Sequence, residues 1–317
     1  MSSHHNLIAL VTRQAPEAEK AWLDTLRTAM PHEVILPVQE MSDAERAQAD
    51  IAIVANPDPA DLELLPNLVW VHSLWAGVER LVMELEGFDR PIVRLVDPKL
   101  SETMAEAVLA WTLYLSRDMP AYASQQRQKL WQQLDYRAAS DTRVGVLGLG
   151  ALGSAASKLL KQVGFDVSGW SRSPKDIADM ICYSGDDGLR QLLGHSDILV
   201  CLLPLTADTI GLLNAEKLAL LPSRSGIINF ARGKVVVTAD LIQALESEKI
   251  KHAVLDVFDA EPLGDTSPLW SHPGVTVLPH ISAPTNAGTA AAIVAGNIGR
   301  YRKRGELPAA IDFSRGY

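Results

Sequence analysis

The apolar residues of this 317-residue chain gather in short runs that alternate with stretches of helical spacing. These runs are rich in β-branched residues and bounded by Pro, Asp or Asn, and they predict strands at 7–11, 34–36, 51–54, 68–71 and 92–96. Between the first two, residues 18–30 carry apolar side chains at helical spacing. Short apolar strands that alternate with helices are typical of a parallel, doubly wound sheet.

A long apolar stretch ends this first array. Residues 104–115 contain neither Gly nor Pro, which predicts a buried helix that connects two domains. Pro120 interrupts it, and residues 122–134 predict a second, Gln-rich helix. A second array of strands is predicted at 144–147, 166–169, 198–202, 226–229, 253–257 and 275–278. One more helix is expected over 289–302.

The two arrays predict an α/β protein with two doubly wound, parallel-sheet domains, as the length of the chain also suggests. The tail from residue 307 is expected to return to the first domain, so that the chain crosses between domains twice. We therefore place one domain at 1–112 and 287–317, and an inserted domain at 113–286.

Composition limits the partners. The net charge of −9 argues against nucleic acid and against an anionic membrane surface, and no apolar run approaches the roughly 18 residues of a membrane span. With only two cysteines, we expect no disulfide and a reducing, cytoplasmic location. The eight histidines are scattered and neither a CxxC nor an HExxH motif occurs, so we expect no metal.

A glycine-rich turn, Gly148-Leu149-Gly150-Ala151-Leu152-Gly153, follows the strand at 144–147 and begins a predicted helix. Gly148 suits a tight turn, Gly150 permits close approach of a pyrophosphate, and Gly153 lets the helix pack close to the strand. The free N–H groups and the positive dipole end of the helix favour phosphates. The turn therefore predicts a dinucleotide site, the alternative being a purely structural turn.

The end of the next strand bears on the choice of dinucleotide. NAD sites usually carry Asp or Glu there, whereas this chain has Ser171, Arg172 and Ser173. Asp166 lies at the wrong end of that strand. A cation between two hydroxyl groups fits a 2′-phosphate, which predicts NADP as the cofactor with NAD still possible. The alternative is that Arg172 is an ordinary solvated cation.

Three polar residues each follow an apolar strand: Arg232, Glu261 and His280. Because the carboxyl ends of parallel strands meet at one crevice, we expect the three side chains beside the dinucleotide. The guanidinium fork of Arg232 suits a carboxylate. A carboxylate at Glu261 would fix the tautomer of His280 and favour a proton-donating imidazolium. The alternatives are a structural ion pair and an ordinary strand-end histidine.

The ordered motifs resemble the D-isomer-specific 2-hydroxyacid dehydrogenases over nearly the whole chain. Besides the glycine turn, they comprise Leu203-Pro204-Leu205-Thr206, Asn229-Phe230-Ala231-Arg232-Gly233, Asp256-Val257-Phe258 with Glu261-Pro262-Leu263, and Pro279-His280-Ile281-Ser282-Ala283-Pro284-Thr285. The resemblance implies a Rossmann cofactor domain inserted in a flavodoxin-like substrate domain. It also implies that His280 is the acid/base, Glu261 its partner and Arg232 the substrate anchor.

The same resemblance suggests further contacts. Asp256 would contact the nicotinamide amide, and the loop 73–78 would bind the substrate carboxylate through the N–H groups of Ala76 and Gly77, unless it is a plain strand-to-helix turn. Other cofactor contacts are expected, besides the glycine turn with Ala151 and Leu152, from Leu203, Pro204, Thr209, Phe230 and Ala231.

Within the family, Trp75, the segment 170–175 and Arg315-Gly316-Tyr317 look most like the bacterial A-type glyoxylate/hydroxypyruvate reductases. We accordingly expect NADPH-dependent reduction of a small 2-oxo acid by a homodimer, with Trp75 restricting the pocket. Trp131 and Trp270 are expected to be packing residues. Two alternatives stay open: a dehydrogenase with a different oxo acid, and a cofactor-sensing interaction protein such as the dehydrogenase-like corepressors.

Overall fold

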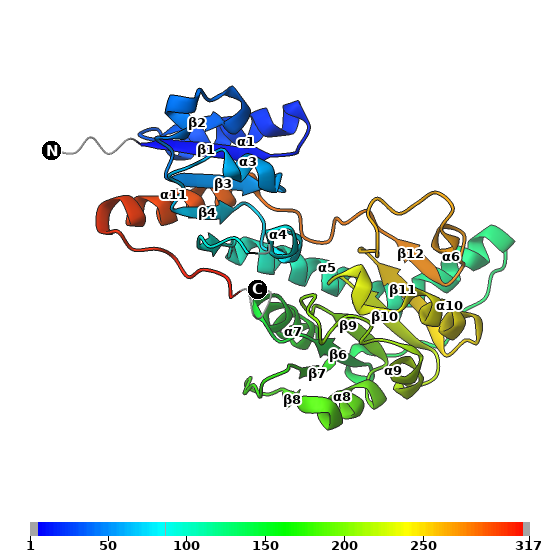
Figure 1. The fold of residues 1–317 in the computed structure, drawn as a ribbon. Coiled ribbons are helices and arrows are strands. Elements are labelled where there is room, and N and C mark those ends of the chain that lie inside the picture. The colour runs from blue at the N-terminus through cyan, green and yellow to red at the C-terminus, as the bar shows by residue number, and fades with distance from the viewer. Residues whose placement is uncertain (1–5, 86, 313–317) are drawn as a thin grey trace. The chain divides into compact units, whose positions relative to one another are not determined.

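A computed structural model describes residues 6–85 and 87–312 of the chain, so that the motif at 315–317 lies outside the described residues. By its internal contacts the chain divides into two compact units (Figure 1). Unit 1 comprises Met1–Lys99 and Thr285–Tyr317, and unit 2 comprises Leu100–Pro284. The assignment of a substrate role to one unit and a cofactor role to the other stays a prediction.

Unit 1 contains a five-stranded parallel sheet in the order β2-β1-β3-β4-β5, which is the flavodoxin-like order. Its strands are β1 (Leu7–Thr12), β2 (Val34–Pro37), β3 (Ile51–Ala55), β4 (Trp70–Ser73) and β5 (Ile92–Val93). Its helices are α1 (Pro16–Ala29), α2 (Asp43–Arg46), α3 (Pro59–Glu63), α4 (Glu79–Glu84) and α11 (Ala287–Arg304). Short η1 (Val38–Glu40) follows β2.

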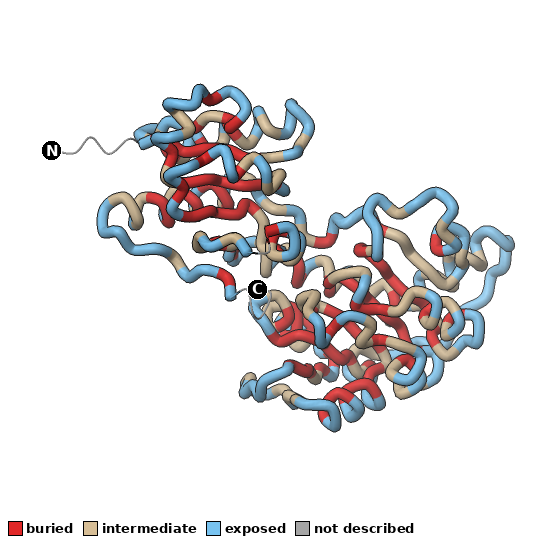
Figure 2. Tube along the Cα trace, viewed as in Figure 1, coloured by how far each residue is buried: buried red, intermediate tan, exposed pale blue. Residues whose placement is uncertain are grey.

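Both faces of this sheet are covered, as the pattern of apolar strands predicts. Along β1, Ile8 and Leu10 pack with α1 and α11, whereas Leu7, Ala9 and Val11 pack with α3 and α4 on the opposite face. Strands β3 and β4 are accordingly buried along their length (Figure 2), whereas Val34 in the edge strand β2 is exposed. The tail returns as expected, because the Ile311 N–H donates to the Ile92 carbonyl oxygen at 2.8 Å.

Unit 2 contains a seven-stranded parallel sheet in the order β12-β11-β10-β9-β6-β7-β8, which extends the Rossmann order by one strand. Its strands are β6 (Arg143–Leu147), β7 (Asp166–Trp170), β8 (Ile181–Tyr183), β9 (Ile198–Cys201), β10 (Ser225–Asn229), β11 (Ile250–Leu255) and β12 (Val275–Val277). Its α-helices are α6 (Met119–Gln128), α7 (Ala151–Val163), α8 (Gly185–Gly194), α9 (Ala215–Leu220) and α10 (Thr238–Glu246). The short helices η2 (Ala139–Asp141), η3 (Gly233–Val235) and η4 (Pro268–Trp270) complete it.

Helix α5 (Pro98–Ser116) begins in unit 1 and continues into unit 2, where it packs with α7 against one face of the sheet. Helices α8, α9 and α10 cover the other face. The strand order reverses between β6 and β9, so their carboxyl ends flank the switch point where ligands bind in such sheets. No helix among residues 6–85 and 87–312 is long and apolar enough to cross a membrane.

The predicted elements are confirmed except in detail. The Gln-rich helix ends at Gln128 instead of 134, because Lys129 adopts a left-handed conformation with φ of 58°. Strand β11 begins three residues earlier than predicted, and the short strand β8 was not predicted. The expectation that Trp131 packs is wrong within this chain, because Trp131 is 99% exposed. Trp270 is 53% exposed, so about half of it is covered.

One buried histidine links β4 to α11. Asn297 Nδ2 donates to His72 Nε2 at 2.8 Å, so the Nδ1–H of His72 donates to the Ser73 carbonyl oxygen at 2.9 Å. The side chain of His72 is completely buried. Burial lowers the pKa of His72 from 6.5 to about 4, because the imidazolium would lose its hydration.

This histidine should make unit 1 sensitive to acid. The unfolded chain takes up the proton near pH 6.5 and the folded chain only near pH 4, so stability that is full above pH 6.5 is lost as the pH falls toward 4. We expect the difference in unfolding free energy between the unmodified protein and His72→Gln to shrink by about 3 kcal/mol between pH 7 and pH 4. Urea unfolding at both pH values measures it, and a constant difference would contradict the prediction.

Candidate active site

The glycine turn after β6 has the geometry of a dinucleotide-binding turn. Gly148 has a left-handed φ of +100°, and a Cβ there would lie 2.7 Å from the Leu202 carbonyl oxygen. A Cβ on Gly153 would lie 1.8 Å from the Gly148 carbonyl oxygen. A Cβ on Gly150 would meet no atom of residues 6–85 and 87–312 within 4 Å. Two of the glycines are therefore required by the fold, whereas Gly150 faces open space.

The amino end of α7 adjoins this space. Gly150 is the N-cap of the 13-residue helix and offers no side chain to the first turn. The first N–H groups of a helix, here those of Ala151 and Leu152, have no partner within the helix and carry its positive dipole end. A cradle of this kind fits the pyrophosphate of a dinucleotide.

The carboxyl end of β7 differs from the expected phosphate site in two respects. The hydroxyl of Ser171 donates to the Ser173 carbonyl oxygen at 2.7 Å, and Ser171 is buried. The exposed guanidinium of Arg172 forms an ion pair of 3.8 Å with Asp208. The strand end thus carries the expected cation and no acid of its own. A carboxylate from the loop after β9 nevertheless lies beside that cation, which the sequence did not indicate.

The loop after β9 is fixed by its own threonine. The hydroxyl of Thr209 donates to the Pro204 carbonyl oxygen at 2.7 Å and accepts the Thr206 N–H at 2.8 Å. These hydrogen bonds shape the turn, and the expected contact of Thr209 with a cofactor stays a prediction. Of the other residues expected to contact the cofactor here, Leu203, Phe230 and Ala231 are buried at the carboxyl end of the sheet, and Pro204 is half-buried.

Arg232 follows β10 in a turn that Asn229 holds. The Asn229 side chain accepts the Ala231 N–H at 3.2 Å and donates to the Arg232 carbonyl oxygen at 3.1 Å. The Arg232 guanidinium donates to the Ala231 carbonyl oxygen at 2.7 Å. Sequence reasoning overlooked this role of Asn229. The available signal was a polar residue at the end of an otherwise apolar strand.

Glu261 and His280 form the expected pair. Glu261 Oε2 lies 2.7 Å from His280 Nδ1, and Glu261 Oε1 accepts the Phe258 N–H at 3.0 Å. With Nδ1–H donating to the carboxylate, His280 Nε2 is left to exchange a proton with a ligand. Both side chains stay accessible, with 56% of His280 and 36% of Glu261 exposed. This is the arrangement of a general acid with an orienting carboxylate.

The backbone at His280 is unusual. Its φ of +56° lies in the left-handed region, which costs a residue with a side chain about 1–3 kcal/mol. The next two N–H groups, of Ile281 and Ser282, donate to Asp256 Oδ1 and Oδ2 at 2.7 and 2.9 Å. Asp256 is 2% exposed. Both oxygens of the residue expected to contact a nicotinamide amide therefore already accept backbone hydrogen bonds.

The candidate carboxylate-binding loop lies in unit 1, after β4. The Trp75 N–H donates to Ser73 Oγ at 3.0 Å, and the Trp75 carbonyl accepts the Leu95 N–H at 3.1 Å. The N–H groups of Ala76 and Gly77 make no hydrogen bond with any residue that the structure describes. The Trp75 ring packs edge-on against Trp22, with centroids 5.8 Å apart. This contact buries part of the Trp75 side chain, and its expected role of limiting a substrate pocket stays a prediction.

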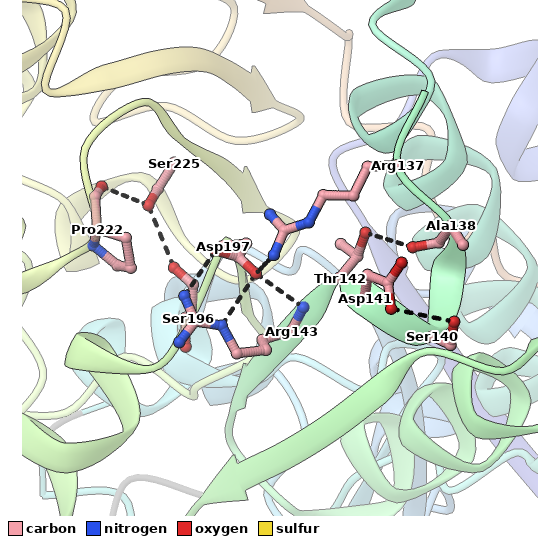
Figure 3. Close-up of polar contacts among 10 residues, drawn as sticks. All are labelled: Arg137, Ala138, Ser140, Asp141, Thr142, Arg143, Ser196, Asp197, Pro222 and Ser225. Atoms are coloured by element: carbon pink, nitrogen blue, oxygen red, sulfur yellow. Dashed lines mark hydrogen bonds and ion pairs between the residues drawn. The ribbon is translucent and has the colours of Figure 1, made fainter. Parts of the chain in front are cut away.

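A cavity of about 670 Å³ lies at the opposite, amino end of the unit 2 strands, and its lining includes charged side chains that form ion pairs. Arg137 and Arg143 both donate to Asp197 on its wall (Figure 3). Although burial opposes it, hydrogen bonds from these two arginines lower the pKa of Asp197. This network fixes the starts of β6 and β9, remote along the strands from the glycine turn.

Comparison with known proteins agrees with this geometry. The model of the D-isomer specific 2-hydroxyacid dehydrogenase NAD-binding domain matches residues 109–282. A glyoxylate/hydroxypyruvate reductase A of Salmonella heidelberg is 35% identical over 302 residues, which cover 93% of this chain and 96% of that protein.

Two solved structures are similar over almost their whole length. One is a D-isomer specific 2-hydroxyacid dehydrogenase of Xanthobacter autotrophicus Py2 in complex with NADPH and MES. It is 40% identical to this chain with a TM-score of 0.91, and the match covers 98% of this chain and 99% of that one. The other is an NADPH-dependent glyoxylate/hydroxypyruvate reductase of Sinorhizobium meliloti in complex with NADP and sulfate, with 33% identity, a TM-score of 0.90 and the same coverage.

The glycine turn can be tested by two single-methyl substitutions with opposite expectations. Gly150→Ala should leave the melting temperature unchanged, because its Cβ meets nothing, and should weaken dinucleotide binding about tenfold or more by obstructing a charge-assisted N–H contact. Gly153→Ala should lower the melting temperature, because its Cβ would overlap the Gly148 carbonyl. Thermal melts and fluorescence titration measure both, and tight binding by a stable Gly150→Ala protein would refute the assignment.

Proposed function

This chain belongs to the D-isomer specific 2-hydroxyacid dehydrogenase family and is an NAD(P)-dependent oxidoreductase, and from that premise we propose that it reduces a small 2-oxo acid with NADPH. The proposed substrates are glyoxylate and hydroxypyruvate, and the products are the corresponding 2-hydroxy acids. The observation that carries the proposal is the 2.7 Å contact between His280 and Glu261 after β12 and β11.

The names of the relatives support the choice of substrate and cofactor. The Salmonella protein is named a glyoxylate/hydroxypyruvate reductase, and the Sinorhizobium protein is named an NADPH-dependent one. The end of β7 supports NADPH independently. NAD sites usually carry an acid there, which would repel a 2′-phosphate, whereas this chain has Arg172. The cytoplasmic location and the homodimer that the sequence predicts belong to the same proposal.

His280 acts as the general acid in this proposal. Its Nε2–H gives a proton to the keto oxygen while Glu261 holds Nδ1 and stabilises the imidazolium. The reduced nicotinamide, when bound, supplies the hydride that the keto carbon accepts. One proton and one hydride together convert the carbonyl to the alcohol. In the reverse direction the neutral imidazole takes the hydroxyl proton.

The substrate carboxylate is assigned to cationic and N–H donors. Arg232 presents a permanent charge and a fork of N–H groups that suits a carboxylate. Asn229 fixes the backbone of its turn, and the guanidinium donates to the Ala231 carbonyl oxygen, which holds the side chain before the substrate arrives. The N–H groups of Ala76 and Gly77 are proposed as further donors, since they make no hydrogen bond with any residue described here.

His280→Ala tests the acid role and the function together. The unmodified protein should oxidise NADPH, followed by its absorbance, with glyoxylate or hydroxypyruvate in a panel of 2-oxo acids. The variant should lose about 10²–10⁴-fold in kcat, because the proton donor is gone, while NADPH affinity changes little. Near-normal turnover in the variant would exclude the acid role. If the unmodified protein turned over no acid of the panel, a cofactor-sensing role would replace the enzymatic one.

Arg172 and Asp208 test the cofactor preference as a pair. Arg172→Ala should raise KM for NADPH by about 10- to 150-fold, the equivalent of one charge-assisted contact, and leave NADH nearly unchanged. Asp208→Asn should act in the opposite direction, because it removes the carboxylate that competes with the phosphate for Arg172. Steady-state kinetics with both cofactors measure the two effects. Equal kcat/KM for NADPH and NADH in the unmodified protein would refute the preference.

A further inference from the structure

The segment after β12 places its key side chain on an unfavourable backbone conformation. His280 has a φ of +56°, and it is followed directly by two N–H groups that point at a single carboxylate. Successive N–H groups next to a left-handed residue form a concave anion-binding nest. In this chain the anion in that nest is the side chain of Asp256.

The contact has the features of a firm anchor. Asp256 is 2% exposed, and each of its oxygens accepts one N–H, at 2.7 Å from Ile281 and 2.9 Å from Ser282. Hydrogen bonds to an ionised acceptor are stronger than neutral ones, and burial excludes competing water. Asp256 itself follows β11 directly, and its N–H donates to the Asn229 carbonyl oxygen at 3.2 Å. Asp256 is therefore held in place by the end of β11 and by its hydrogen bond to Asn229.

We propose that Asp256 is the positioning residue of His280: its carboxylate holds the N–H groups of Ile281 and Ser282 and thereby keeps His280 in the left-handed conformation that directs its ring to Glu261. This rests on the proposed acid role of His280. It differs from a contact with the nicotinamide amide, because Asp256 acts here through the backbone of the chain and before any ligand binds.

Two carboxylates that follow β11 then hold different parts of His280. Asp256 fixes the backbone on the carboxyl side of His280, and Glu261 fixes the ring at Nδ1. Glu261 is anchored in turn by the Phe258 N–H. An aspartate is required at 256 because both oxygens accept, whereas an asparagine would turn one NH2 donor toward an N–H donor.

The test is a double-mutant cycle between Asp256→Asn and His280→Ala. We expect Asp256→Asn alone to lower kcat by about 10- to 100-fold, because a small misplacement of the acid is enough for such a loss. The dissociation constant for NADPH should stay within about twofold. In the His280→Ala background the same substitution should change kcat by no more than about twofold, since a residue that acts only through His280 has nothing left to position.

Asp259→Asn is the matched control. Asp259 lies three residues further on, is exposed, and accepts from the Thr238 hydroxyl instead of residues 280–282. It should leave kcat unchanged. The proposal is overturned if Asp256→Asn costs as much kcat without His280 as with it, or if it mainly raises the dissociation constant for NADPH, as a nicotinamide contact would.

Amide hydrogen exchange in the unmodified, cofactor-free protein provides a readout that needs neither turnover nor a folded variant. The amides of Ile281 and Ser282 should exchange slowly compared with exposed Gly150, because each is bonded to a buried carboxylate. Exchange at the rate of an open loop would overturn the proposal even if Asp256→Asn failed to fold. Normal turnover by His280→Ala would remove the acid role alone, and the exchange rates would still decide whether Asp256 holds this turn.

Discussion

The parallel pairing of the strands in unit 2 determines where its chemistry can occur. Because all seven strands run in one direction, their carboxyl ends share one edge, and every candidate group of this unit follows one of them. The opposite edge carries the Arg143–Asp197 network, which fixes strand starts. Ion pairs therefore hold the strand starts at one edge of the sheet, whereas the groups proposed to bind ligands lie at the other edge.

The groups at this edge are held by the backbone more than by one another. Asn229 spans the turn of Arg232, Thr209 spans the loop after β9, and Asp256 spans the turn after His280. Each contact satisfies a buried polar group while fixing the conformation of a loop. Binding then requires little ordering of the chain, which is the general advantage of a preorganised site.

Much of this could be predicted from the order of residues. Apolar runs located the strands because burial requires them. The spacing of the glycines after β6 was informative because a Cβ on Gly148 or Gly153 would collide with the backbone. Glu261 and His280 were expected together because each follows a strand, and the structure brings them to 2.7 Å. These inferences rest on local pattern and on the regularity of parallel sheets.

Other features depend on contacts between distant segments and have no local signal. The ion pair of Arg172 with Asp208, the packing of Trp75 on Trp22, and the capture of Asp256 by two N–H groups all belong to this class. The end of the Gln-rich helix at Gln128 also lacks a sequence signal, because Lys129 leaves the helical conformation without a Gly or Pro to mark it. A motif identified these residues as important without revealing what each one touches.

The exposed ion pair at the end of β7 also bears on how such a protein can diverge. Arg172 and Asp208 are both exposed, and substitutions at exposed positions usually change stability by less than about 0.5 kcal/mol. The turn after β12, by contrast, depends on a buried carboxylate and a strained backbone. Selection can therefore exchange one nucleotide cofactor for another at little cost to the fold. The residues that set the proton-transfer geometry depend on one another, so they can change only together.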